Sequence, residues 1–216
     1  PIHTGEAQVE ALAVKDGKLA GVPVDVEGQD DKLDPGQGRQ IADRMLNDEG
    51  IRLLTGIVFS NVAGAVVPEV TGSDAIYVSA NAGPSTLAGK GCNENYFVAS
   101  WQNDTLHETA GVLANTLGYK RMFILAPNYQ AGHDALTGFK RKFGGEVVDE
   151  VYTPLGQTDF SAEIARIRAA GPDVVYQFHP GESGIAFVKQ YQQAGLGNIP
   201  MVLAEPSLDA TTLKAV

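Results

Sequence analysis

The sequence contains very little cysteine, comparatively little positive charge and no long apolar run. Cys92 is the only cysteine among 216 residues, which excludes an internal disulfide bond and a zinc site built from several cysteines. No stretch of about 18 consecutive apolar residues occurs, so the sequence predicts no membrane-spanning helix. Lysine and arginine number 16 against 26 aspartate and glutamate residues. The resulting net charge of -10 disfavours a nucleic-acid backbone as a partner, because two negative surfaces repel each other.

The beginning of the chain carries no signature of a secretory leader. The first residue is Pro1, and no charged segment followed by an apolar segment comes after it. We therefore expect a chain that was processed or cut from a longer one, which leaves its destination open.

The signatures of several enzyme classes are also missing. Gly36 and Gly38 precede a predicted helix, but Ile41 stands where a dinucleotide-binding fingerprint needs its third glycine. No phosphate-binding loop and no Gly-x-Ser-x-Gly elbow occurs. We therefore expect neither covalent chemistry nor a bound cofactor or metal.

The histidines do not form a metal-binding pattern either. His107 is followed by Gly111, where a zinc metalloprotease would carry its second histidine. We expect His107 and His133 to lie on solvated faces of helices.

The sequence does contain a regular alternation of short apolar runs with helical patterns. Such alternation predicts an α/β fold, in which parallel strands are covered by helices. Asp34 followed by Pro35 is a typical helix start, with the aspartate as N-cap. The predicted strands span residues 22–27, 52–59, 75–79, 96–100, 121–126, 146–152, 173–178 and 201–204. The predicted helices span residues 35–48, 60–70, 104–117, 131–143, 160–169 and 183–194.

The alternation falls into two halves that meet near residues 118–120. We expect two lobes, formed by residues 1–118 and 119–216. The chain enters at a predicted helix, residues 5–14, and stops within another, residues 209–216. A strand before the first helix would normally sit in the centre of such a sheet, so we expect the fold to be incomplete at both ends.

Residues that follow the predicted strands are candidates for a binding site, because ligands of open α/β sheets bind beyond the carboxyl ends of strands. Ser60 opens a helix at such a place. Its hydroxyl either caps the helix or contacts a ligand carboxylate, while the N–H groups of Asn61 and Val62 hold the other oxygen. Both interpretations remain open.

Other strand ends offer similar candidates from both halves. Residues 79–84 form either an ordinary turn or a loop with exposed amides. Tyr129 offers an apolar ring and one hydroxyl, which suit a pocket. His179 and Glu205 follow later strands. Each of these residues either packs on its own lobe or faces a cleft between two lobes.

The whole set of segments resembles the extracytoplasmic solute-binding proteins of branched-chain amino acid-type ABC transporters, which have the type I periplasmic binding fold. The resemblance implies two doubly wound parallel-sheet lobes that close on a small solute in the periplasm, and docking on a membrane permease with its ATPase. The segments that carry it are residues 17–24, 30–31, 56–68, 77–86, 100–104, 125–132, 157–164 and 173–178.

The resemblance also assigns roles to individual residues. Ser60 matches the hydroxyl residue that holds the carboxylate of the ligand. Tyr129 matches an aromatic residue that the second lobe lays over the ligand, and His179 or Pro180 stands at a second aromatic position. Glu205 lies near the acidic residue that pairs with the ammonium group of an amino acid.

The class of ligand follows from a departure in the same pattern. Gly83 stands where amino acid binders of this family usually carry a threonine, whereas residues 81–86 and 100–104 are similar to the subgroup that binds aromatic carboxylates. We therefore expect an aromatic carboxylate first and a branched-chain amino acid second. A ligand-sensing module of a receptor or regulator with the same fold is the alternative. The predicted ligand-binding residues are Phe59, Ser60, Asn61, Asn81, Ala82, Gly83, Trp101, Tyr129, His179, Pro180 and Glu205.

Overall fold

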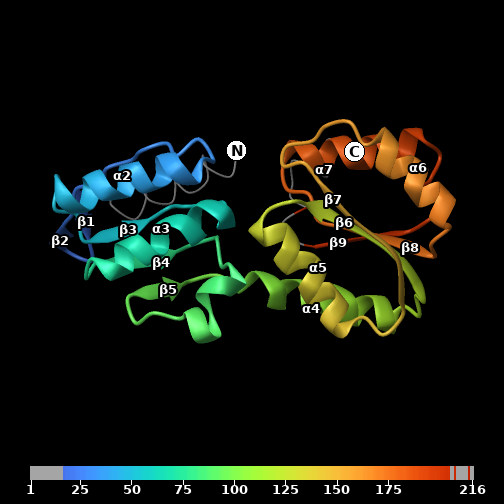
Figure 1. Ribbon diagram of the computed structural model, residues 1–216, viewed down its shortest axis with the longest axis horizontal. Helices are drawn as coiled ribbons and strands as arrows, with labels where there is room; N and C mark the ends of the chain where they lie inside the picture. Colours follow the sequence, from blue (N-terminus) through green and yellow to red (C-terminus); the bar gives the residue numbers. More distant parts are fainter. Residues whose placement is uncertain (1–16, 205–206, 208–213, 215–216) are drawn as a thin grey trace. The chain divides into compact units, whose positions relative to one another are not determined.

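The computed structural model describes residues 17–204, 207 and 214, and its chain divides into two compact units, Pro1–Ser100 and Trp101–Val216 (Figure 1). Both units are built on parallel strands connected by helices, which confirms the predicted α/β fold. No helix in the described ranges is both long enough and apolar enough to cross a lipid bilayer.

The first unit contains a three-stranded parallel sheet with the order β3-β4-β5. The strands span Leu53–Thr55, Ile76–Ser79 and Tyr96–Val98, and two short 3-10 helices, η2 (Ser85–Leu87) and η3 (Gly89–Gly91), connect β4 to β5. Helices α2 (Pro35–Asn47) and α3 (Ser60–Gly72) pack together and cover one face of this sheet. Leu54 and Tyr77, which lie opposite each other in the register, are buried beneath them.

The other face of this sheet carries exposed apolar side chains. Successive residues of a strand point to opposite faces, so Leu53 and Ile76 turn away from α2 and α3. Leu53 is 59% exposed, Ile76 41% and Phe97 53%.

Two expectations for the first unit need correction, and one is confirmed. The strand predicted over 52–59 ends at Thr55, because Gly56 has a φ of 96°, which lies outside the extended region. The strand predicted over 22–27 is reduced to β2 (Val22–Pro23), which pairs antiparallel with β1 (Lys18–Leu19). The predicted start of α2 is confirmed, since Asp34 accepts a hydrogen bond of 2.8 Å from the N–H of Gln37.

The second unit contains a four-stranded parallel sheet with the order β7-β6-β8-β9. The strands are β6 (Arg121–Pro127), β7 (Glu146–Thr153), β8 (Val174–Gln177) and β9 (Met201–Leu203). Helices α4 (Asn103–Thr116) and α5 (Gln130–Lys142) cover one face of the sheet. Helices α6 (Ser161–Ala170) and α7 (Glu182–Gln193) cover the other, as Figure 1 shows within this unit. This unit is therefore doubly wound.

The division between the units lies at Ser100 and Trp101, earlier than the boundary predicted between residues 118 and 119. The reason is the packing of α4, which lies against α5 instead of against the first sheet. A Cβ atom on Gly138 of α5 would stand 2.0 Å from the backbone oxygen of Asp104 in α4. The two helices approach each other so closely that α4 belongs structurally to the second unit.

Candidate functional site

In the first unit, Ser60 lies at the carboxyl end of the sheet, where the segment after β3 enters α3. Ser60 is the first residue of the helix and is 3% exposed. The N-cap position belongs to Phe59, which makes no side-chain capping bond. The interpretation of Ser60 as an N-cap is therefore wrong, and the interpretation as a ligand residue stays a prediction.

The amide groups around Ser60 differ from the prediction in one respect. The N–H groups of Val62 and Ala63 donate to the backbone oxygen of Phe59, at 3.0 and 2.9 Å. Val62 therefore has its N–H occupied within the helix and was wrongly assigned to a ligand. Asn61 is half-buried, and its Oδ1 atom is buried without a hydrogen-bond partner among the described residues.

The turn after β4 is held by side chains of the sheet. The Ser79 hydroxyl donates to the backbone oxygen of Ala82 at 2.6 Å, and the Tyr96 hydroxyl donates to the same oxygen at 3.2 Å. Because a trans peptide directs its oxygen and its N–H in opposite directions, the N–H of Gly83 points away from Ser79. Ala82 and Gly83 are buried, and Asn81 is half-buried. The segment is therefore a fixed turn with a defined amide direction.

A further hydrogen bond connects the segment before Ser60 with β4, which precedes the turn at Ala82. The hydroxyl of Tyr77 in β4 accepts a hydrogen bond of 3.0 Å from the N–H of Ile57, which lies between β3 and α3. The segment that leads from β3 to Ser60 is thus bonded to β4, the strand that precedes the turn containing Ala82.

In the second unit, Tyr129 and Pro180 lie at a topological switch point. The neighbouring strands β6 and β8 lead into α5 and α7, and these helices cover opposite faces of the sheet. The loops after the two strands therefore diverge at their carboxyl ends, which is where ligands bind in open α/β sheets. Tyr129 packs partly against the core beneath α5, and burial raises the pKa of its hydroxyl, as does the neighbouring Asp134 carboxylate. Pro180 is half-buried.

His179 differs from Pro180, because its side chain lies inside the second unit. It is 0% exposed, and its ring packs edge-on against Phe160 and stacks with Phe187. Its Nε2 atom lies 3.0 Å from the Thr153 hydroxyl, and its Nδ1 atom lies 3.0 Å from the side-chain oxygen of Gln177. Burial lowers the pKa of His179 to about 3. Both ring nitrogens are engaged in the core, so the geometry favours Pro180 over His179 as the residue that meets a ligand.

The two remaining predicted residues are Trp101 and Glu205. Trp101 begins the second unit and is 36% exposed. Glu205 lies outside the described residues.

The expected solvation of His107 is wrong. This residue is 2% exposed, its Nδ1 atom lies 2.6 Å from the Tyr176 hydroxyl, and its ring meets Phe178 edge-on. Burial lowers the pKa of His107 to about 4, although the negative charge of Asp104 acts in the other direction and raises it. The cause is the position of α4, which covers the face of β8 that carries Tyr176. His133 is exposed, as predicted.

Two polar residues at strand ends were missed by the sequence reasoning. Thr153 and Gln177 are each at most 1% exposed, and each directly follows apolar residues at the carboxyl end of its strand. A polar residue that closes an apolar run at the carboxyl end of a strand is the signal that points to them.

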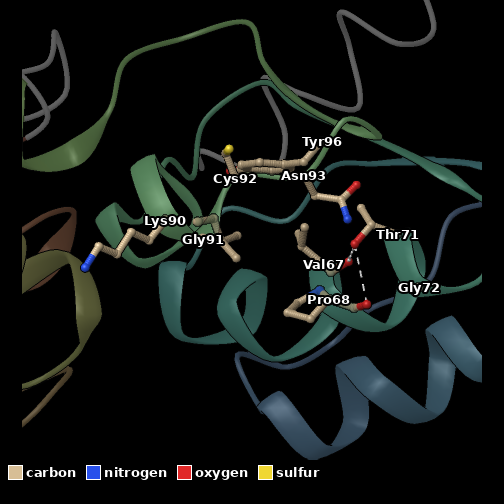
Figure 2. Close-up of a pocket in the computed structure, with 10 residues that line it drawn as sticks. Val67, Pro68, Thr71, Gly72, Lys90, Gly91, Cys92, Asn93 and Tyr96 are labelled. Carbon is tan, nitrogen blue, oxygen red and sulfur yellow. Dashed lines mark hydrogen bonds between the residues drawn. The ribbon is translucent and has the colours of Figure 1, made fainter.

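The first unit also contains a pocket of about 220 Å³, shown in Figure 2, between α3 and the segment of η2 and η3. Thr71, Lys90, Cys92 and Tyr96 are among its lining residues, and none of the predicted ligand residues lines it. The Thr71 hydroxyl donates to the backbone oxygen of Val67 at 3.0 Å, and Figure 2 shows the Lys90 ammonium group pointing away from the other labelled side chains. This pocket is therefore separate from the candidate site.

Comparison with known proteins supports the resemblance seen in the sequence. The family model described as periplasmic binding protein matches residues 5–216. A relative from Brucella melitensis biotype 1, named Leu/Ile/Val-binding protein homolog 6, is 30% identical over 211 residues, which are 93% of this chain and 53% of that protein.

Two solved structures of solute-binding proteins are similar over nearly the whole chain. One, from an R. palustris ABC transporter in complex with benzoate, has a TM-score of 0.91 and 26% identity over 99% of this chain and 59% of its own. The other, from Rhodopseudomonas palustris HaA2 in complex with p-hydroxybenzoic acid, has a TM-score of 0.86 and 27% identity over 97% of this chain and 60% of its own. The chain therefore spans little more than half the length of the proteins that it matches.

Proposed function

Because this chain belongs to the periplasmic binding protein family, we propose that it binds a small organic acid outside the cytoplasm for delivery to an ABC permease and its ATPase. The proposed solute is an aromatic carboxylate, with a branched-chain amino acid as second candidate. Binding is reversible and involves no covalent chemistry. The observation that carries the proposal is the match of nearly the whole chain to a benzoate-binding protein, with the candidate residues at the carboxyl ends of the strands.

The carboxylate is assigned to the first unit. Ser60 stands at the N-terminus of α3, where the helix dipole favours a negative charge by roughly 0.3–1 kcal/mol. The turn after β4 adds the Ala82–Gly83 peptide, whose orientation is set by Ser79 and Tyr96. A hydroxyl and directed amide groups are the donors that a carboxylate requires.

The aromatic part of the solute is assigned to Tyr129 and Pro180 of the second unit. Both residues present apolar surface at the switch point between β6 and β8. Gly83 has no side-chain hydroxyl that could bind the α-amino group of an amino acid. Its presence therefore favours an aromatic carboxylate that lacks an α-amino group. A Kd of 1 μM corresponds to about -8 kcal/mol, more than one carboxylate contact supplies, so burial of the ring must contribute.

The role of Ser60 is tested by Ser60→Ala in the full-length gene product. Loss of a hydrogen bond to a charged group costs about 1.5–3 kcal/mol, so we expect benzoate to bind about tenfold to a hundredfold more weakly by titration calorimetry. Ser73→Ala is the matched control, because Ser73 caps the other end of α3 and its hydroxyl donates to the Glu69 backbone oxygen. Unchanged affinity in Ser60→Ala would remove Ser60 from the site.

The class of solute is tested by a thermal-shift screen with benzoates and branched-chain amino acids. A ligand at one hundred times its Kd stabilises the folded protein by about 2.7 kcal/mol, which raises the melting temperature visibly. We expect a rise with benzoates and none with leucine or valine. A rise with leucine or valine alone would assign the amino acid class instead.

A further inference from the structure

The loops that carry Tyr129 and Pro180 leave the sheet toward opposite faces, so their relative position requires a fixed connection. Backbone pairing between β6 and β8 ends where the N–H of Phe178 donates to the Leu125 oxygen at 3.1 Å, and it cannot continue at the last residue of β6. The N–H of Asn128 faces β7, where it donates to the Thr153 oxygen at 2.7 Å. Residue 127 therefore faces β8, and Pro127 has no N–H to donate there.

Thr153 makes the connection that the proline cannot make. It is the last residue of β7, lies opposite Pro127 in the register and is 1% exposed. Its backbone oxygen holds Asn128 in the loop after β6, and its hydroxyl lies 3.0 Å from the Nε2 atom of His179 in the loop after β8. Since β6 lies between β7 and β8, this side-chain bond spans a strand.

The direction of the bonds around His179 follows from the chemistry of its partners. The side-chain oxygen of Gln177 only accepts, so the Nδ1 atom of His179 carries the proton and donates to it. The Nε2 atom is then the acceptor, and the Thr153 hydroxyl is the donor. The ring is held between Phe160 and Phe187, which fixes the acceptor in place.

The backbone after His179 is held as tightly as its ring. A Cβ atom on Gly184 in α7 would stand 2.1 Å from the His179 backbone oxygen, so the loop lies directly on the helix. The ring of His179 and the next residue, Pro180, therefore share a backbone that is fixed against α7.

We propose that Thr153 is a positioning residue of the binding site, which holds the loops after β6 and β8 in one fixed relation through its backbone oxygen and its hydroxyl. This inference rests on the proposed function. Thr153 does not touch the solute in this arrangement. It acts through Asn128 on the loop of Tyr129, and through His179 on the loop of Pro180.

The test compares three variants of Thr153 in the full-length gene product. Thr153→Val keeps the shape and removes the hydroxyl, Thr153→Ala removes it with a smaller side chain, and Thr153→Ser keeps it. Thr116→Val, which changes an exposed threonine of α4, is the control. Two quantities are measured: the Kd for benzoate by titration calorimetry, and hydrogen–deuterium exchange of the backbone amides in residues 178–184.

We expect Thr153→Val to raise the Kd by up to about tenfold, because solute binding must then order loops that the hydroxyl no longer holds, and to speed exchange in residues 178–184. Thr153→Ser should restore both values. In a His179→Phe background, Thr153→Val should cause no further loss, because the hydroxyl acts through His179.

Three outcomes would overturn the proposal. The first is unchanged Kd and exchange in both Thr153→Val and Thr153→Ala. The second is loss in Thr153→Ser without loss in Thr153→Val, which would show that the methyl group and not the hydroxyl matters. If the unmodified protein binds no benzoate, the proposed solute class fails, and hydrogen–deuterium exchange alone tests the role of Thr153. The third outcome is then equal exchange in Thr153→Val and the unmodified protein, which would show that the hydroxyl does not hold the loop after β8.

Discussion

At His107 and His179, burial keeps two imidazole rings neutral inside the second unit. Burial is the main cause that lowers their pKa values, from 6.5 to about 4 for His107 and to about 3 for His179. An unfolded chain takes up a proton at each histidine below pH 6.5, whereas the folded unit does so only near pH 4 or pH 3. The stability that depends on these rings is therefore complete above pH 6.5 and is lost as the pH falls toward 4.

The contribution of His107 to this acid sensitivity can be measured by substitution. His107→Gln keeps a polar partner for the Tyr176 hydroxyl but removes the titrating group. Between pH 6 and 4.5 we expect the free energy of unfolding to fall less steeply in this variant, by up to about 1.4 kcal/mol per pH unit. Urea unfolding over a pH series provides the values, with the exposed His133→Gln as control. Parallel pH profiles for His107→Gln and the unmodified protein would contradict the assignment.

Single residues also show where sequence reasoning reaches its limit. The position of Ser60 at the start of a helix was predictable, because an apolar run followed by a helix start is visible in the sequence, although the strand itself ends earlier, at Thr55. The choice between His179 and Pro180 was not, since it depends on Thr153 and Gln177, which the fold brings to the ring from other positions in the chain. The burial of His107 likewise depends on which sheet α4 covers.

Among the elements, α4 and α5 owe their close packing to glycine. A Cβ atom on Gly111 of α4 would stand 2.6 Å from the Phe139 oxygen, and one on Gly138 of α5 would stand 2.0 Å from the Asp104 oxygen. Each glycine thus admits the backbone of the other helix. The ion pair between Arg141 and Asp104, at 2.8 Å, lies across the same contact. This packing explains why the predicted boundary at residue 118 was too late: helical periodicity reveals an apolar face but not its partner.

Two glycine substitutions test how much stability is lost when a side chain is added at the close contact between α4 and α5. Gly138→Ala forces the two helices apart, and we expect it to destabilise the protein by about 1–3 kcal/mol. Gly64→Ala, within α3, meets nothing within 4 Å among the described residues and should stabilise by up to about 1 kcal/mol, because alanine favours helix. Thermal unfolding of both variants gives the comparison. A neutral Gly138→Ala would show that the helices separate without cost.

At the scale of the whole molecule, the parallel α/β architecture was predictable, but which faces of each sheet are covered was not. Alternating patterns reveal strands and helices one after another, whereas coverage of a sheet face depends on segments from elsewhere in the chain. The first sheet is covered by α2 and α3 on one face only among the described residues, with Leu53, Ile76 and Phe97 exposed on the other. The relatives extend beyond the matched part, which is 53% of the Brucella melitensis protein and 59% of the benzoate-bound structure.

The exposed sheet face predicts that the 216-residue chain by itself binds an apolar dye. We expect anilinonaphthalene sulfonate fluorescence to rise on addition of the chain, because a contiguous apolar patch accepts such a dye. The triple variant Leu53→Thr, Ile76→Thr and Phe97→Thr keeps residues that suit a strand and should reduce the signal. The same three substitutions leave α2 and α3 untouched, so circular dichroism checks that the unit still folds. Undiminished fluorescence in a folded triple variant would place the dye elsewhere.

The strand order of the second unit has a consequence for biogenesis. β6 is central, yet both of its neighbours, β7 and β8, follow it in the chain. During synthesis, Phe123 and Leu125, which end up fully buried, emerge well before residues 146–153 and 174–177 that will flank them. Until then β6 is an unpaired apolar strand with two open edges, the form most prone to associate with other chains. The order of strands therefore opens an interval in which chaperone binding competes with folding, and that interval closes only when β8 has been made.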